Sequence, residues 1–272
     1  MGLFDSKGRG VSKDTPQNPF LRFFAILFRK FLSFINVSVI YAVAMLPTLI
    51  PVILVAGIVS APMVLELEQG FASVMDIFYR VMIAYLFTVL WGLGPATAGI
   101  CYVTRNWADE SHSWIWGDFK DTAKENWKQA LTVYLIDLFV FVLLYLSLSI
   151  YGSMEGIAGG MQYVVLGFLL LYTMMHFYLY PMMVTFSMKL KDIYLNAFML
   201  AIARFPKNLF VLAVLLLIHA GGFSLTLVYN NGFILPIMML LESVFLLAFS
   251  SYFVNYMIYP ILKKIREEQK NG

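Results

Sequence analysis

Six long, predominantly apolar stretches constrain the fold of this chain more than any other feature. They lie near residues 32–60, 81–104, 130–151, 163–187, 209–229 and 233–258. Because a helix needs about 20 apolar residues to cross the ~30 Å hydrocarbon layer of a bilayer, each stretch predicts one transmembrane helix. The composition agrees, since 61% of the residues are hydrophobic and 13% are charged, against about 25% charged residues in soluble domains. We therefore expect an all-α membrane protein that forms a single transmembrane domain over residues 1–272.

The last two stretches are separated by a short turn signal. Asn230, Asn231 and Gly232 interrupt an otherwise continuous apolar run, and Asn-Gly pairs favour turns. With this turn the chain has six spans arranged as three helical hairpins. Without it the chain has five.

The distribution of basic residues predicts the orientation. If the amino terminus is cytoplasmic, every Lys and Arg except Arg80 falls in an inner segment, and the outer loops carry the acidic residues Glu66, Glu68, Asp76 and Glu155. Inner loops of membrane proteins carry an excess of Lys and Arg. We expect both termini in the cytoplasm, with residues 1–19 as a polar cytoplasmic tail.

A pattern that recurs three times indicates an internal repeat. An aromatic and basic stretch containing Asn36, Asn126 or Asn208 precedes each odd-numbered span, and a proline followed by cations ends each even-numbered span. The repeat units are approximately 20–105, 114–190 and 192–266. Each leading stretch is expected to form an amphipathic helix that lies in the cytoplasmic interface.

The segment from Arg105 to Lys128 is rich in aromatic residues. Its large aromatic side chains are Trp107, Trp114, Trp116, Phe119 and Trp127. One interpretation is an aromatic belt at the level of the lipid headgroups. The other is a docking surface for a second protein subunit, because interfaces are enriched in aromatic residues.

Four ionisable side chains interrupt the apolar stretches: Asp137, His176, His219 and Glu242. Helix geometry places Asp137 and His176 at a similar depth on adjacent spans, and His219 and Glu242 likewise on the last two. Intramembrane ionisable residues are costly and often functional. Two interpretations remain open: a proton relay or polar substrate path, or hydrogen bonds that fix each hairpin.

Proline and glycine residues predict local departures from regular helix. Pro47 and Pro51 should kink or break the first span, with hydroxyl groups such as that of Thr48 satisfying freed carbonyls. The small residues of the sequence GPATAG, with Gly94, Pro95 and Gly99, should permit a close backbone crossing.

The sequence contains no recognisable catalytic or cofactor-binding pattern. Cys101 is the single cysteine, the three histidines are scattered, and nucleophile-elbow, zincin and nucleotide-binding patterns are absent. The net charge of +3 is small for a nucleic-acid-binding protein. We expect no enzymatic activity, no cofactor, no metal and no nucleic-acid partner.

Three stretches carry a family resemblance: residues 7–41, residues 94–130 and the sequence FPKNLFVLAV. The most specific parts are GPATAG, Tyr102 with Arg105, residues 118–120 and residues 126–129. Together they resemble the YesL family of bacterial integral membrane proteins, a domain of unknown function. Members of that family tend to be encoded beside binding-protein-dependent ABC importers for oligosaccharides in Gram-positive bacteria.

The resemblance implies a non-catalytic accessory subunit in the bacterial cytoplasmic membrane. Such a subunit contacts lipids and packs on the permease subunits of an importer that also has an ATPase and a binding protein. Two alternatives are a stand-alone small-molecule transporter or channel that uses the four buried ionisable residues, and a membrane sensor that signals through the cytoplasmic segment.

Overall fold

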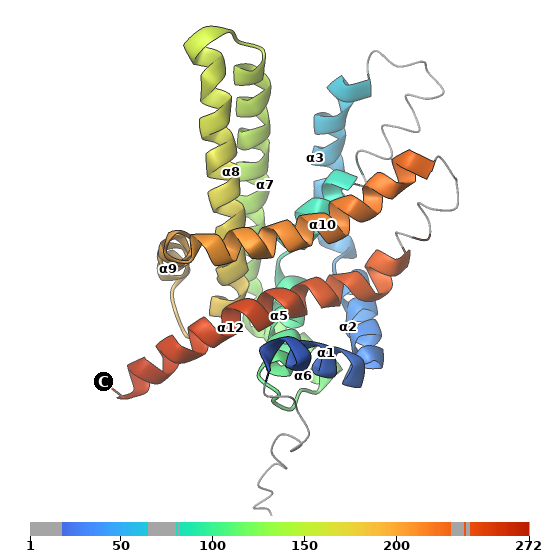
Figure 1. Ribbon diagram of the computed structural model, residues 1–272, viewed down its shortest axis with the longest axis vertical. Helices are drawn as coiled ribbons and strands as arrows, with labels where there is room; N and C mark the ends of the chain where they lie inside the picture. The colour runs from blue at the N-terminus through green and yellow to red at the C-terminus, as the bar shows by residue number, and fades with distance from the viewer. Residues whose placement is uncertain (1–17, 65–79, 81, 230–236, 238–239, 272) are drawn as a thin grey trace, which may run out of the picture.

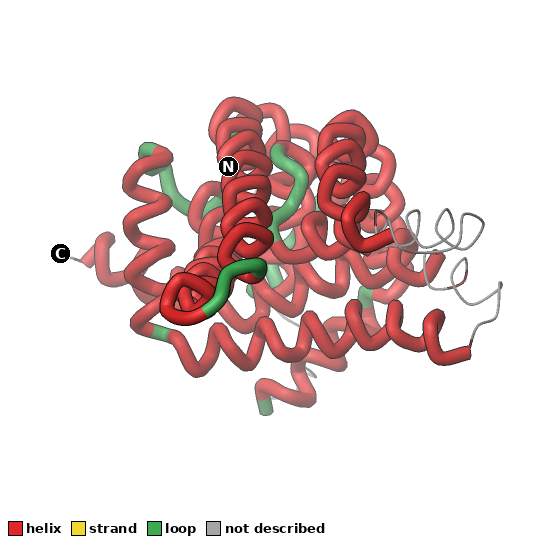
Figure 2. Tube along the Cα trace, turned by 90° about the horizontal axis from the view of Figure 1, so that it is seen from above, coloured by secondary structure: helices red, strands yellow, loops and turns green. Residues whose placement is uncertain are grey.

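The computed structural model describes residues 18–64, 80, 82–229, 237 and 240–271. Every regular element in these residues is a helix (Figure 2). In chain order the helices are α1 (Pro19–Arg29), α2 (Phe31–Ala44), α3 (Leu46–Val64), Met82–Leu90, α5 (Pro95–Ala108), α6 (Ile115–Glu125), α7 (Trp127–Gly152), α8 (Gly156–Met183), α9 (Leu190–Ala203), α10 (Phe205–Tyr229), a π-helical turn (Glu242–Leu246) and α12 (Leu247–Asn271).

Three of these helices are long and apolar enough to cross a bilayer alone. They are α7, α8 and the continuous helix Glu242–Glu268, and the number of spans rises to six if each of three bent helix pairs is one span. In Figure 1 the α7–α8 hairpin stands upright, while α10 and α12 run across the view. Many large apolar side chains on the spans are exposed, among them Phe139, Phe168 and Leu217. The chain is therefore an all-α, multi-pass membrane protein whose helices contact lipid.

The three bent pairs each contain an abrupt change of direction. The bend is 71° between α1 and α2, 54° between Met82–Leu90 and α5, and 93° between α9 and the first part of α10. The sequence predicted the second span as one helix, but Gly92 and Gly94 adopt positive φ angles and interrupt it. Glycine adopts such angles without the steric cost that a Cβ brings.

The predicted break in the first span is confirmed. Helix α2 ends at Ala44 and α3 begins at Leu46, immediately before Pro47. The hydroxyl of Thr48 lies 2.9 Å from the carbonyl oxygen of Met45 and 3.3 Å from that of Leu93. Met45 already accepts the amides of Thr48 and Leu49, so the role of this hydroxyl at a carbonyl freed by Pro47 stays a prediction.

Two asparagines stabilise the ends of short helices that precede long ones. Nδ2 of Asn126 donates to the carbonyl oxygen of Thr122, at the end of α6. Nδ2 of Asn208 donates to the carbonyl oxygens of Leu200 and Ala201, at the end of α9. The carbonyl oxygens of Thr122 and Leu200 also accept the backbone amides of Asn126 and Arg204, so the asparagine side chains add further hydrogen bonds at these helix ends.

The loop after α5 forms ion pairs with both the first and the last described helix, α1 and α12. The carboxylate of Glu110 pairs with Arg22 and Arg29 of α1, and Asp109 pairs with Lys263 of α12 over 2.7 Å. Helices α1, α5, α6 and α12 consequently gather at one end of the molecule (Figure 1).

Helix α5 lies at the centre of this end, packed against both α6 and α12. Of the small residues expected to permit a close crossing, Gly94 and Pro95 begin α5. Gly99 lies against α6, where a Cβ would stand 2.7 Å from the carbonyl oxygen of Phe119. A backbone atom at that distance leaves no room for a side chain.

We predict that Gly99→Ala lowers the free energy of unfolding by about 1–3 kcal/mol, because the added methyl group forces α5 and α6 apart. Gly167→Ala is the matched control, since a Cβ at Gly167 of α8 meets nothing within 4 Å. Thermal unfolding of the purified protein in detergent measures both. Equal stability of the two variants would contradict the close crossing.

Candidate functional site

The interrupted second span forms the centre of the candidate site. Between Leu90 and Pro95 the chain leaves helical geometry, with φ of +86° at Gly92 and +70° at Gly94. A break of this kind frees backbone donors and acceptors inside the membrane, where each must find a partner within the protein. Broken helices often mark binding sites in membrane transporters for this reason.

Side chains from neighbouring helices supply those partners. The contacts are His176 Nδ1 to the Trp91 carbonyl oxygen at 3.1 Å, the Leu93 amide to Thr97 Oγ1 at 2.7 Å, Thr48 Oγ1 to the Leu93 carbonyl oxygen at 3.3 Å, and the Gly94 amide to the Tyr180 hydroxyl at 3.3 Å. The break is therefore held by polar groups of α3, α5 and α8.

The first predicted acid and histidine are brought together between α7 and α8. Nε2 of His176 lies 3.0 Å from Oδ1 of Asp137, and both side chains are essentially inaccessible. The hydroxyl of Tyr172 donates to the same carboxylate oxygen over 2.7 Å. Among the described residues, neither His176 Nε2 nor Asp137 Oδ2 has a partner in hydrogen-bonding geometry.

The second predicted acid and histidine also meet. Nδ1 of His219, on α10, lies 3.1 Å from Oε2 of Glu242 in the π-helical turn. The hydroxyl of Tyr85 lies 2.6 Å from the same nitrogen and donates to Glu242. On the other side of the ring, Nε2 of His219 lies 2.7 Å from Oγ of Ser250.

The π-helical turn supplies the geometry of this second pair. A π turn is rare and frequently lies at a functional site. Here it holds Glu242 buried, at 3% exposure, opposite His219. Ser250 stands two helical turns later on the same helix, so one imidazole contacts both residues.

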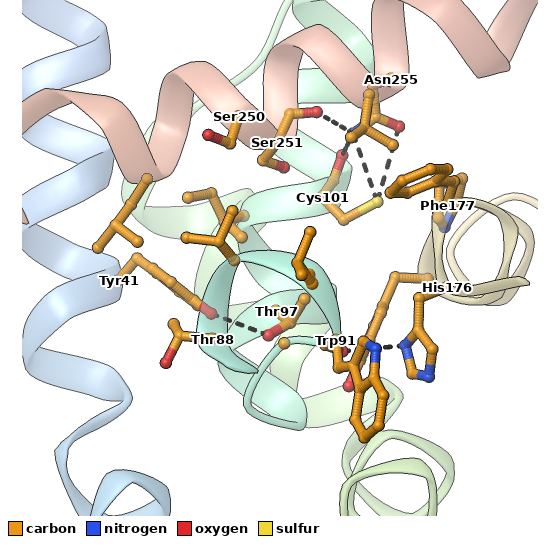
Figure 3. A pocket seen from close by; sticks show the side chains of 18 residues that line it. Tyr41, Thr88, Trp91, Thr97, Cys101, His176, Phe177, Ser250, Ser251 and Asn255 are labelled. Carbon is orange, nitrogen blue, oxygen red and sulfur yellow. Dashed lines mark hydrogen bonds between the residues drawn. The ribbon is translucent and has the colours of Figure 1, made fainter. Parts of the chain in front are cut away.

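A small cavity of about 70 Å³ is lined by His176 of the first pair and by Ser250, which contacts His219 of the second. In Figure 3 Ser250 lies at the upper left and His176 at the lower right, with Tyr41 and Thr88 on the left side and Thr97 in the middle. The cavity also borders the broken segment at Trp91. Its lining is mainly apolar, and His176, Asn255 and several hydroxyl groups are its polar members.

A hydrogen-bonded cluster continues from the cavity toward α12. Nδ2 of Asn255 donates to Thr104 Oγ1 over 3.1 Å, and Thr104 Oγ1 lies 2.8 Å from the hydroxyl of Ser251. Buried Cys101 contacts the same asparagine. These contacts join α5 to α12 beside the cavity.

The sequence interpretation did not identify Tyr85, Tyr172, Ser250 or Asn255 as part of a site. Each is a polar residue within an apolar stretch, and that signal was available. Tyrosine and serine are common enough in membrane helices that only the contacts with an acid or a histidine distinguish these particular residues.

A second, larger cavity lies at the other functional candidate, the aromatic segment. It has a volume of about 840 Å³ and is formed by the junction of α6 and α7 together with the loop between α8 and α9. Its lining includes Trp127, Lys124, Lys128 and Lys189. The exposed fractions of Trp114, Trp116 and Trp127 are 78%, 63% and 49%.

Two of the aromatic residues predicted as partner contacts are buried within the chain itself. Trp107 is 1% exposed and packs on Phe34, with ring centroids 4.8 Å apart. Phe119 is 4% exposed and lies against Gly99. The expectation that they contact a partner is wrong, because their position on the inner faces of α5 and α6 withdraws them from the surface.

One known family matches the central part of the chain. Residues 74–148 match the model of a family described as a protein of unknown function, DUF624. The match covers the broken second span, α5, α6 and Asp137, and it contains one of the three stretches that carry the YesL resemblance, residues 94–130. The assignment to the YesL family itself stays a prediction. No curated protein and no solved structure matches the chain.

We predict that Asp137 and His176 are energetically coupled. Asp137→Leu and His176→Leu should each lower the free energy of unfolding by about 3–5 kcal/mol, because each strands a buried polar partner. The double variant should lose at least about 1 kcal/mol less than the sum. The free energy of unfolding of the wild type, the two single variants and the double variant, each purified in detergent, measures this coupling.

The control is a second set of variants in which His112, an exposed histidine, takes the place of His176 as the partner of Asp137. Asp137→Leu and His112→Leu should be additive, since the two residues share no partner. If the Asp137 and His176 cycle is equally additive, the pair contributes nothing through its contact.

Proposed function

We propose that this chain is a non-catalytic accessory subunit of a bacterial ABC importer for oligosaccharides, and that it packs on the permease subunits. The resemblance to the YesL family supplies the context of this proposal. The partner assembly comprises two permease subunits, an ATPase and a binding protein, and the chain lies in the bacterial cytoplasmic membrane.

The observation that carries the proposal is the contrast between the two cavities. The central one, about 70 Å³, has room for a few water molecules, each of which takes about 30 Å³ in the liquid, and not for a sugar ring. The polar cavity at the α6–α7 junction, about 840 Å³, has exposed Trp127 in its lining. This contrast favours contact with another protein over passage of a sugar through the chain.

The proposed contact surface comprises Trp114, Trp116 and Trp127 with the adjoining cavity. Exposed tryptophan is costly in water, and Trp is strongly enriched among the residues that dominate binding energy at interfaces. Lys124, Lys128 and Lys189 surround the same cavity. We infer that an acidic or carbonyl-rich segment of the permease occupies it.

The topology proposed with this function has six spans and both termini in the cytoplasm. The location of basic residues supports this orientation. The sharp bends after α1 and α9, and the helix end at Asn126 after α6, suit three short helices that lie along the cytoplasmic interface before the chain enters the membrane. The three units 20–105, 114–190 and 192–266 then form a threefold repeat of helical hairpins.

A second candidate function is a stand-alone transporter or channel for a small molecule. The observation that favours it is the pair of buried acid–histidine contacts, Asp137 with His176 and His219 with Glu242, with His176 also lining the small central cavity. A substrate that used this route would have to be far smaller than an oligosaccharide.

We predict that the double variant Trp114→Ala, Trp116→Ala reduces recovery of the permease subunits by about tenfold or more, because it removes two exposed anchors from the contact surface. The measurement is a gentle detergent pull-down of the tagged chain from its native membrane, with quantitative mass spectrometry of the copurified subunits.

Tyr163→Ala is the matched control, because Tyr163 is a large aromatic residue that is 70% exposed on α8. Recovery should be unchanged with this control. Recovery of the chain alone, or only as its own oligomer, from wild-type membranes would refute the accessory role.

We predict that Ser153→Cys, in the turn between α7 and α8, reacts with a membrane-impermeant maleimide in intact cells, whereas Lys120→Cys in α6 reacts only after lysis. Both positions are exposed, and native Cys101 is buried and contributes no background. Labelling of Lys120→Cys in intact cells, with Ser153→Cys labelled only after lysis, would contradict the proposed orientation.

A further inference from the structure

The bend between α9 and α10 carries two basic residues, Arg204 and Lys207. Arg204 follows the last residue of α9, Lys207 lies in the first turn of α10, and the chain turns by 93° between the two helices. Both precede the apolar stretch 209–229. Lys207 is half-buried, and its burial together with the nearby charge of Arg204 lowers its pKa. Neither residue forms an ion pair within the part of the chain that the structure describes.

The bend between α1 and α2 carries the same kind of pair and has its own counter-ion. Arg29 ends α1 and Lys30 follows it, and burial together with Arg29 lowers the pKa of Lys30. Here a carboxylate oxygen of Glu110 lies 3.5 Å from Arg29, and Nζ of Lys30 lies 5.6 Å from the centroid of the Trp107 ring. A carboxylate and the face of an indole both stabilise cations. Among the described residues, the α9–α10 bend has no such partner for Arg204, so an anion from outside the chain suits that position.

A cavity of about 350 Å³ lies at the α9–α10 bend, within the range of roughly 300–1,000 Å³ that is typical of ligand pockets. Figure 1 shows α9 and the start of α10 at the left, the side toward which α12 runs to its C-terminus. The cavity is lined by Arg204, Lys207 and, from α12, Lys264 and Glu268. Lys264 lies 3.8 Å from Glu268 of its own helix. Arg204 and Lys207 are therefore the two cations that remain for a ligand.

The rest of the lining is apolar and includes Leu200, Ile261 and Ile265. The segments that line the cavity lie just outside the apolar stretches 209–229 and 233–258. The ends of membrane-spanning stretches lie at the level of the lipid headgroups. A phospholipid places a phosphate beside apolar chains at this level, so its two parts match the two parts of the lining. A free phosphate ion would match the cations alone.

We propose that this cavity binds the headgroup of an anionic phospholipid, with the phosphate between Arg204 and Lys207 and an acyl chain against the apolar wall. A guanidinium group donates two parallel hydrogen bonds to a phosphate, and a lysine adds a compact charge. Basic pockets between membrane helices bind anionic headgroups in this manner. The site lies on helices that do not form the proposed permease contact surface, and it binds lipid whatever protein partner the chain has.

The test uses the purified full chain in an uncharged detergent, with native mass spectrometry to count bound lipid. The chain is titrated with phosphatidylglycerol and, separately, with phosphatidylcholine that has the same acyl chains. We expect the wild-type chain to bind one phosphatidylglycerol molecule at least about tenfold more tightly than phosphatidylcholine, because the ammonium group of choline cancels the negative charge of the headgroup.

The double variant Arg204→Gln, Lys207→Gln should weaken the binding of phosphatidylglycerol by about tenfold or more, because it removes both phosphate ligands. The matched control is Lys191→Gln, Arg266→Gln, which removes the same charge from exposed positions on α9 and α12 that do not line the cavity. The control should bind phosphatidylglycerol as the wild type does. An equal loss in the control would overturn the proposal, since binding would then follow the total charge of the chain.

Inorganic phosphate distinguishes a lipid from a free anion as the ligand. At the same concentration as the lipid, it should leave phosphatidylglycerol bound, because it makes no contact with the apolar wall. Displacement of the lipid under these conditions would overturn the assignment to a phospholipid. Equal affinity of the wild-type chain for phosphatidylglycerol and phosphatidylcholine would also overturn the proposal, and this result does not depend on whether any variant folds.

Discussion

The carbonyl oxygen of Trp91 accepts a hydrogen bond from His176, and the amides of Leu93 and Gly94 donate to Thr97 and Tyr180. These bonds exist because the second span stops being a helix at Gly92 and Gly94. In lipid, unsatisfied backbone groups cost several kcal/mol each, so the break requires polar side chains from α5 and α8 at that depth. His176, once oriented by the break, presents its other nitrogen to Asp137. The buried pair and the cavity follow from the interrupted backbone.

Much of this arrangement was predictable from the sequence because helix geometry converts residue number into depth. Asp137 and His176 were expected at one level and His219 and Glu242 at another, and the structure brings each acid to its histidine. The break in the first span was likewise predictable, since Pro47 lacks the amide that a continuous helix needs. The number of long apolar stretches set the upper limit of six spans.

Other parts depend on tertiary contacts that periodicity does not contain. The break at Gly92 was not predicted, because glycine in an apolar stretch is compatible with both a straight helix and a turn. Trp107 and Phe119 were expected at the surface, yet Trp107 packs on Phe34 of α2 and Phe119 lies against Gly99 of α5. Tyr85 and Tyr172 take part in the site only because helix packing brings each hydroxyl to a carboxylate.

The two candidate regions have different physical characters and suit different roles. The inner one is small and mainly apolar, with His176 and several hydroxyl groups in its lining. The outer one is large and bounded by lysines and exposed tryptophans, so it suits a protein segment. Their separation is compatible with an accessory subunit whose interior is not a route for sugar.

The most direct test of that account is uptake of a labelled oligosaccharide into liposomes that contain the purified chain alone, compared with liposomes that contain the complete importer with and without the chain. The account predicts no uptake by the chain alone and a change in the rate or stability of importer-dependent, ATP-driven uptake when the chain is present. Uptake by the chain alone, at a rate above that of empty liposomes, would contradict it and assign the transport route to the chain's own centre.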